Sequence, residues 1–201
     1  MAREIEIKIP LTDKEYDSIF AGVYSKKSFD GVRFEKDVEH LLKSDRYFSR
    51  YDTRQERDEK GEPKVIRIRS EANTDSGETK AFFCIKYKTV ENGIELNSEN
   101  ETFVQDSAVI EKLLEVSGYK IYFDKKKDAF SVYCRSSINK EIDFHLELEK
   151  VNGLKYVEIE VTESELPADI VRSTLEGLVG QLGLDASKRD SRSWMEITKH
   201  L

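Results

Sequence analysis

The stretch Arg3-Glu4-Ile5-Glu6-Ile7-Lys8-Ile9, followed by Pro10, decides the fold. Its even positions carry charged side chains and its later odd positions carry isoleucine. Because successive side chains of a β-strand point to opposite faces, the stretch predicts a strand with one charged and one aliphatic face. Pro10 has no N–H for a strand ladder and is expected to end the strand. Taken alone, this pattern is typical of an edge strand with one solvated side.

The same alternation returns in later segments, at 65–69, 81–88, 141–149 and 156–161. The charges also sort by segment: the acidic positions are Glu4, Glu6, Glu141, Asp143, Glu147, Glu149, Glu158 and Glu160, and the basic ones are Lys8, Arg67, Arg69, Lys86 and Lys88. An open antiparallel sheet with one solvated face would show less order on that face. We therefore expect an α+β fold, in which a closed or nearly closed antiparallel β-barrel forms a tunnel with a charged interior and helices packed on the outside.

The remaining segments predict helices and connections around this barrel. Helices are expected over about 12–20, 107–118, 167–183 and 193–199, and the first of them begins with a Thr12–Glu15 capping box. Residues 54–64 are polar, contain Gly and Pro, and are expected to form an exposed loop. The basic run 124–128 is expected to lead into a strand at 129–133, although such a run could also be merely solvated. The chain shows no long repeat or linker, so we expect residues 1–201 to form a single domain.

Composition limits the partners of the protein. Of its 201 residues 36% are charged, against roughly 25% in typical domains, and the net charge is −7. An acidic chain should not attract nucleic acid non-specifically, and neither a signal peptide nor an apolar run of the ~20 residues needed for a membrane span is present. Cys84 and Cys134 lack metal-binding spacing and are expected to be free thiols of a cytoplasmic protein. A monomer and a homodimer are both compatible with the sequence.

Acidic and basic side chains that face each other inside a barrel suit one kind of chemistry. Carboxylate oxygens are preferred ligands of Mg²⁺ and Mn²⁺. Arginine forks bind pairs of phosphate oxygens, and lysines add point charges. The pattern therefore indicates a site for a metal ion together with a small polyphosphate.

With its strands in this order, the sequence resembles the CYTH family, the triphosphate tunnel metalloenzymes. The hallmark of that family, Glu-x-Glu-x-Lys in the first strand, is matched by Glu4, Glu6 and Lys8. The arginine strand at 67–69, the lysine strand at 85–88, the lysine run at 125–127 and the acids at 158–160 follow in the family's order. The resemblance extends from residue 3 to about 196. The family includes class IV adenylate cyclases and thiamine and inorganic triphosphatases.

The resemblance implies roles for individual residues. The implied catalytic residues are Glu4, Glu6 and Lys8; the implied metal ligands are Glu4, Glu6, Glu158, Glu160 and Glu149; and the implied triphosphate-binding residues are Lys8, Arg67, Arg69, Lys86 or Lys88, and Lys125 or Lys127. The sequence departs from the family at Glu149, where an aspartate is usual, and at Lys127, where an arginine is frequent. These departures leave the substrate preference open. Trp194 is expected to pack rather than to stack on a substrate, although a C-terminal helix can line the tunnel mouth in this family.

Three functions are compatible with these residues. The first is Mg²⁺- or Mn²⁺-dependent hydrolysis of an inorganic or organic (nucleoside or thiamine) triphosphate, a small-molecule substrate. The second is a class IV adenylate cyclase, which converts ATP to cyclic AMP and pyrophosphate and needs a nucleoside pocket that the sequence does not reveal. The third is a non-catalytic polyphosphate-binding module. Hydrolysis is favoured, because water needs no shaped pocket.

Overall fold

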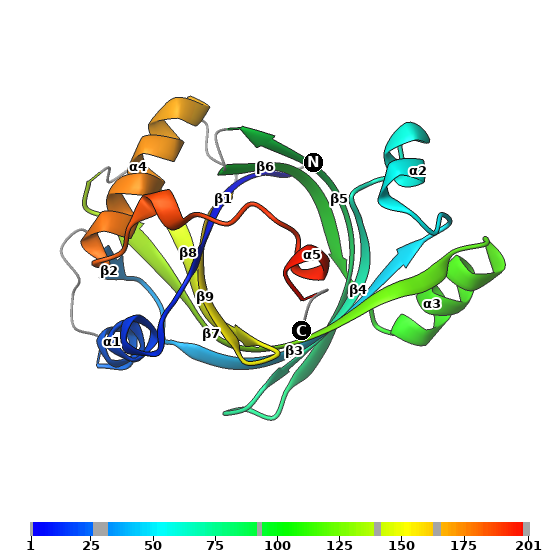
Figure 1. Cartoon of the computed structure of the whole chain (residues 1–201). Helices are drawn as coiled ribbons and strands as arrows, with labels where there is room; N and C mark the ends of the chain where they lie inside the picture. The colour runs from blue at the N-terminus through cyan, green and yellow to red at the C-terminus, as the bar shows by residue number, and fades with distance from the viewer. Residues whose placement is uncertain (1, 26–31, 92–93, 139–141, 163–165, 199–201) are drawn as a thin grey trace.

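The computed structural model describes residues 2–25, 32–91, 94–138, 142–162 and 166–198 (Figure 1). The strands are β1 (Ala2–Pro10), β2 (Val32–Phe34), β3 (Glu39–Ser49), β4 (Val65–Asn73), β5 (Thr79–Glu91), β6 (Ile94–Phe103), β7 (Lys120–Ser136), β8 (Asp143–Val151) and β9 (Leu154–Thr162). The helices are α1 (Asp13–Tyr24), α2 (Arg54–Glu59), α3 (Ser107–Val116), α4 (Ala168–Gln181) and α5 (Trp194–Thr198), with a 3₁₀ turn at Ala186–Lys188. Glu141, which the alternation places on an acidic face, lies outside the described residues.

The strands form a closed antiparallel barrel. Across the residues that the structure describes, eight strands pair in the order β7-β3-β4-β5-β6-β1-β9-β8, and β8 pairs back onto β7. The short strand β2 adds to the far end of β7. β1 has a partner on each side, β6 and β9, and is therefore not an edge strand. The prediction of a closed barrel is confirmed, and Figure 1 looks down its axis.

The apolar core lies outside the barrel wall, under α1 and α4. The aliphatic face of β1 is fully covered, since Ile5, Ile7 and Ile9 are at most 1% exposed. They join one cluster with Val171, Leu175 and other residues of α4. Because the aliphatic faces of the strands turn toward these helices, the charged faces turn into the barrel.

Truncating Leu175 should strongly destabilise this core. Leu175 is completely buried in α4 against the barrel wall. Leu175→Ala removes buried apolar groups and leaves a cavity, so we expect the free energy of unfolding to fall by about 2–5 kcal/mol in urea unfolding. The control Val116→Ala, on the exposed side of α3, should change it by less than about 0.5 kcal/mol. Equal effects of the two substitutions would contradict a core under α4.

Two sequence expectations were wrong in detail. The predicted loop at 54–64 contains α2, which begins with a capping box of Thr53 and Glu56. The polar composition of this segment does not predict a helix. The helix is anchored by the Arg57 guanidinium, which lies 4.3 Å from the centre of the Tyr122 ring. The basic run at 124–128 does not precede a strand but lies within β7, with Lys125 and Lys127 buried. Among the described residues, no helix has the length and apolarity that a membrane span requires.

Candidate active site

The barrel encloses a cavity of about 690 Å³ that is lined mainly by charged side chains. The candidate residues that line it are Glu4, Glu6, Lys8, Arg67, Arg69, Lys86, Lys88, Lys125, Glu158 and Glu160. Two further candidates, Lys127 and Glu149, are buried in the wall behind the lining. Both Lys86 and Lys88 therefore face the cavity, whereas only Lys125 of the lysine run lines it. The cavity thus brings acids and bases from distant parts of the chain into one enclosed space.

Strand register explains which side chains meet. In the β1–β9 pair, Glu6 lies opposite Glu160 and Lys8 lies opposite Glu158. On the other side of β1, Glu6 lies opposite Glu95 of β6. Since directly opposite residues of antiparallel strands share a face, the even positions of β1 meet the even positions of β9 inside the barrel.

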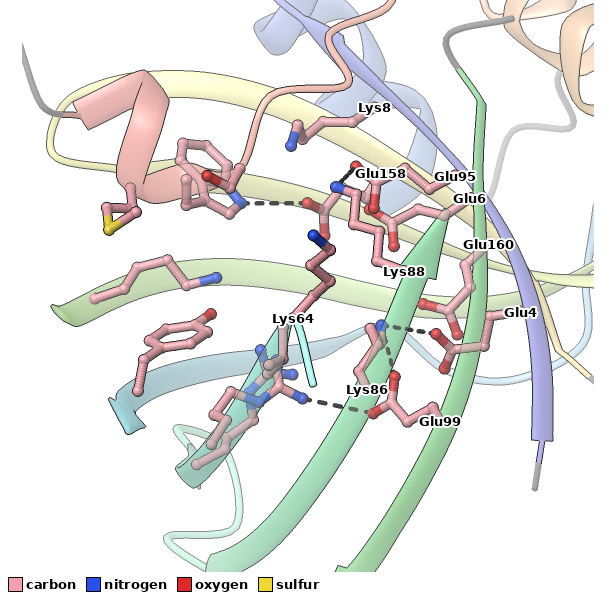
Figure 2. Close-up of a pocket in the computed structure, with 18 of the residues that line it drawn as sticks. Glu4, Glu6, Lys8, Lys64, Lys86, Lys88, Glu95, Glu99, Glu158 and Glu160 are labelled. Atoms are coloured by element: carbon pink, nitrogen blue, oxygen red, sulfur yellow. Dashed lines mark hydrogen bonds and ion pairs between the residues drawn. The ribbon is translucent and has the colours of Figure 1, made fainter. Parts of the chain in front are cut away.

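Three carboxylates that line the cavity form an open acidic group. Oxygens of Glu4, Glu6 and Glu160 lie within 4.8 Å of one another. The Lys86 ammonium lies 2.7 Å from Glu4 and 2.6 Å from Glu99, so that it bridges the two, as Figure 2 shows. Burial raises the pKa of Glu4 to about 8, with Glu160 reinforcing and Lys86 opposing the shift, and burial also raises the pKa of Glu6. Neighbouring carboxylates repel one another when they are ionised. Such a group of oxygen donors fits a hard divalent cation.

A second acidic group lies beside Lys127, with Glu147 and Glu158 lining the cavity and Glu149 buried. Oxygens of Glu147, Glu149 and Glu158 lie within 4.8 Å of one another. Lys127 forms ion pairs with all three, at 2.6 Å from Glu147 and 3.1 Å from Glu158. Lys43 adds a second ammonium, 2.5 Å from Glu147. Because two ammonium groups already compensate this group, a divalent cation fits it less well than the first group.

The metal ligands implied by the sequence therefore fall into two places. Glu4, Glu6 and Glu160 share the open group, whereas Glu158 and Glu149 lie beside Lys127. Register is the reason, since Glu158 lies opposite Lys8 on one side and opposite Glu147 on the other.

The stability of the metal-free protein should fall as pH rises from about 5 to 8. Burial raises the pKa of both Glu4 and Glu149 from 4.5 to about 8 in the folded state. Between these values the folded state binds more protons than the unfolded chain, so the free energy of unfolding decreases with pH. Urea unfolding in EDTA should show a lower midpoint at pH 8 than at pH 5.5. Glu149→Gln should flatten this slope, and a midpoint that instead rises with pH would contradict these shifts.

The candidate basic side chains of the lining come from four strands: Lys8 from β1, Arg67 and Arg69 from β4, Lys86 and Lys88 from β5, and Lys125 from β7. Arg67 donates to Glu101 at 3.1 Å, while its buried Nε has no hydrogen-bond partner among the described residues. Lys8 donates to the backbone carbonyl of Arg192 at 2.7 Å, just before α5. Lys88 forms an ion pair with Glu95. The cavity therefore offers cationic donors along its length.

Sequence reasoning missed several residues of this site. Lys43, Asp45 and Tyr47 are buried at odd positions of β3, whereas the even positions Leu42, Ser44 and Arg46 are exposed. The sequence signal was again the alternation of side chains along a strand. The usual rule assigns apolar residues to the buried face and charged residues to the exposed face, but here Leu42 is exposed and the charged residues are buried. These positions lie in a segment that the sequence left ambiguous.

Trp194 of α5 both packs and lines the cavity. It is 7% exposed, its ring centre lies 4.8 Å from that of Tyr156, and its Nε1 donates to Glu158 at 3.3 Å. Met195 and Glu196 also line the cavity. The last helix therefore contributes to the lining, and Figure 1 shows it within the outline of the ring.

Comparisons with solved structures identify the fold. No protein-family model matches the chain, and no curated protein matches its sequence. The PH1819 protein of Pyrococcus horikoshii OT3 superposes with a TM-score of 0.71 at 20% identity, over 98% of each chain. A candidate adenylate cyclase of Vibrio parahaemolyticus gives 0.61 at 18% identity, over 98% of this chain and 97% of that one. HpAC1 of Hippeastrum, a candidate adenylyl cyclase with a dominant triphosphatase activity, gives 0.62 at 15% identity, over 100% and 96%.

These similarities cover nearly the whole chain, although identities of 20% and below extend to the fold alone. They agree with the closed barrel. The chain therefore shares the closed antiparallel barrel fold of these solved structures.

Proposed function

We propose that the protein is a divalent-metal-dependent hydrolase of inorganic or organic triphosphates. The observation that carries this proposal is the convergence of two opposed groups on one cavity. Glu4, Glu6 and Glu160 place carboxylate oxygens within 4.8 Å of one another, and the arginines of β4 line the same enclosed space. Acids for a metal ion and cations for a polyphosphate are thus within reach of a single small ligand.

Each wall would have its own task. Mg²⁺ or Mn²⁺ held by Glu4, Glu6 and Glu160 would supply charge neutralisation and an activated water. Arg67 and Arg69 would bind phosphate oxygens and stabilise the charge that spreads over the transferring phosphoryl group. The remaining candidate lysines of the lining would bind further phosphate oxygens along the triphosphate. They are Lys8, Lys86, Lys88 and Lys125.

The second acidic group would support the site rather than hold the metal. Lys127 already contacts Glu147 and Glu149, and Lys43 pairs with Glu147. We therefore assign Glu149 and Lys127 to the buried wall behind the substrate, and we place Glu158 between the two groups, beside Lys8 and the Trp194 indole.

Hydrolysis is favoured over cyclisation because it demands less of the cavity. An attacking water needs no shaped pocket, whereas cyclisation requires a ribose whose 3′ hydroxyl is held against the phosphate. The dominant triphosphatase activity of the similar HpAC1 supports the same choice. Adenylate cyclase activity is the second candidate, since the similar Vibrio protein is described as a candidate cyclase.

One assay separates the candidates. The purified protein is incubated with tripolyphosphate or ATP and with Mg²⁺ or Mn²⁺, with EDTA as the control. Metal-dependent release of phosphate is expected. Cyclic AMP with pyrophosphate would instead establish the cyclase, and binding without turnover would establish a non-catalytic module; either result would overturn the hydrolase.

The two cysteines bear on the cellular location of the protein. Cys84 and Cys134 are both buried free thiols, which is consistent with the predicted cytoplasmic location. A small-molecule triphosphate is the proposed partner. Light scattering would decide between a monomer and a homodimer.

A further inference from the structure

One buried carboxylate lies at the centre of the basic wall. Asp45 of β3 is 1% exposed. Its Oδ1 accepts from Arg69 Nε at 2.6 Å, and its Oδ2 accepts from Arg69 Nη2 at 3.0 Å. Oδ2 also lies 3.1 Å from Lys125 Nζ and 3.9 Å from an Arg67 nitrogen, and it accepts from the Tyr47 hydroxyl at 3.2 Å. A single carboxylate thus contacts three cations.

Register places Asp45 between the strands that carry these cations. It lies opposite Arg69 of β4 on one side and opposite Lys125 of β7 on the other. Arg67, Arg69 and Lys125 line the cavity, whereas the Asp45 side chain has no exposed surface. Asp45 therefore holds the three cations from behind, on the side away from the ligand space.

Other acids also pair with these cations. Arg67 lies 3.1 Å from Glu101, and Arg69 lies 3.6 Å from Glu71. The group is therefore defined by the fixed positions of its cations and not by an excess of positive charge. Cations that are fixed in advance suit a binding site for a polyanion, because they need no reorganisation when the ligand arrives.

We propose that Asp45 is a positioning residue that fixes Arg69 and Lys125 for triphosphate binding. This inference rests on the proposed function, since it assigns the polyanion to the basic wall. Asp45 uses two donors of Arg69, and the remaining Nη1 of this arginine lies 3.6 Å from Glu71. The carboxylate thereby fixes the plane of the guanidinium and the direction of the Lys125 ammonium.

The protonation states agree with this role. Burial alone would raise the pKa of Asp45, but Arg69, Lys125 and Arg67 lower it well below its usual range, so it stays ionised. Burial lowers the pKa of Lys125 to about 8, and Asp45 is the largest charge that opposes this shift. The groups that act on Lys125 from all sides are Asp45 and the Tyr47 ring on β3, Arg69 on β4, Lys127 on β7, Glu149 on β8, Glu158 on β9 and the Trp194 ring on α5.

The test compares Asp45→Asn, Asp45→Glu and the control Asp143→Asn, in which an exposed carboxylate paired with Arg135 is changed. Calorimetry in EDTA measures the Kd for tripolyphosphate, and steady-state assays with Mg²⁺ measure kcat and KM. Asp45→Asn should weaken binding by about tenfold or more, because Arg69 is no longer held and Lys125 loses its counter-ion. Asp143→Asn should match the wild type. An unchanged or tighter Kd in Asp45→Asn would overturn the proposal.

Two further comparisons keep the result interpretable. Asp45→Glu keeps the buried charge but displaces the carboxylate, so it should raise Kd and KM even if Asp45→Asn does not fold; wild-type values in Asp45→Glu would overturn the proposal. Loss of folded protein lowers kcat and leaves KM unchanged, whereas misdirected cations raise KM. Tripolyphosphate binding should weaken at high pH as Lys125 loses its proton. In Asp45→Asn this weakening should occur at a lower pH, because Asp45 no longer raises the pKa of Lys125. Because Kd is measured without metal, a wild type that binds without turnover would overturn the hydrolase and leave this test intact.

Discussion

Replacing Glu6 with glutamine should lower kcat for metal-dependent hydrolysis of tripolyphosphate by about 10³-fold. Glu6 is buried, and its carboxylate shares the open acidic group with Glu4 and Glu160. Glutamine keeps the volume but removes the negative charge that a hard divalent cation requires. Burial, with Glu95 and Glu158, raises the pKa of Glu6 well above its usual range. Burial thus disfavours the charged form of Glu6 in the metal-free protein, and glutamine should preserve its stability.

This separation of activity from stability makes the Glu6 substitution informative. Circular dichroism and urea unfolding should match those of the wild type, while phosphate release with Mg²⁺ collapses. The matched control is Glu78→Gln, an exposed acid in the turn before β5, which should retain full activity. Wild-type turnover by Glu6→Gln would remove Glu6 from the site.

Replacing Arg67 with glutamine should raise the KM for tripolyphosphate by about 10²-fold, because the loss of a buried charged partner typically costs 2–5 kcal/mol. Arg67 lines the cavity, donates to Glu101, and keeps a buried Nε without a hydrogen-bond partner among the described residues. A donor that is held in place and left unpaired is suited to a phosphate oxygen. Glutamine lacks both the paired N–H donors of a guanidinium and its positive charge.

Arg46→Gln is the control for this substitution. Arg46 lies on the outward face of the same wall, where its Nη1 donates to both carboxylate oxygens of Glu111 of α3. Steady-state kinetics should show wild-type values for Arg46→Gln. Similar KM values for the two variants would place phosphate binding somewhere other than the arginine face of β4.

The sequence predicted the faces of the strands because alternation is a local property. Ile5, Ile7 and Ile9 could only turn toward an apolar layer, and Glu4 and Glu6 could only turn away from it. Closure of the barrel followed from the sorting of charge by segment. These inferences needed no knowledge of which strands are neighbours.

The grouping of the acids needed that knowledge. Glu158 and Glu160 are equivalent in sequence, yet Glu160 lies opposite Glu6, whereas Glu158 lies opposite Lys8 and Glu147. Only the registers on both sides of β9 separate the two residues. Asp45 was missed for a related reason, since a charged residue at the centre of a buried wall is defined by its neighbours on β4 and β7.

A triphosphate and a divalent metal ion should lie together inside the barrel, and a crystal structure with Mn²⁺ and tripolyphosphate tests this most directly. Anomalous data should place Mn²⁺ about 2.0–2.3 Å from oxygens of at least two of Glu4, Glu6 and Glu160. The phosphate chain should lie against Arg67 and Arg69. An empty tunnel with both ligands on the outer surface would contradict the account.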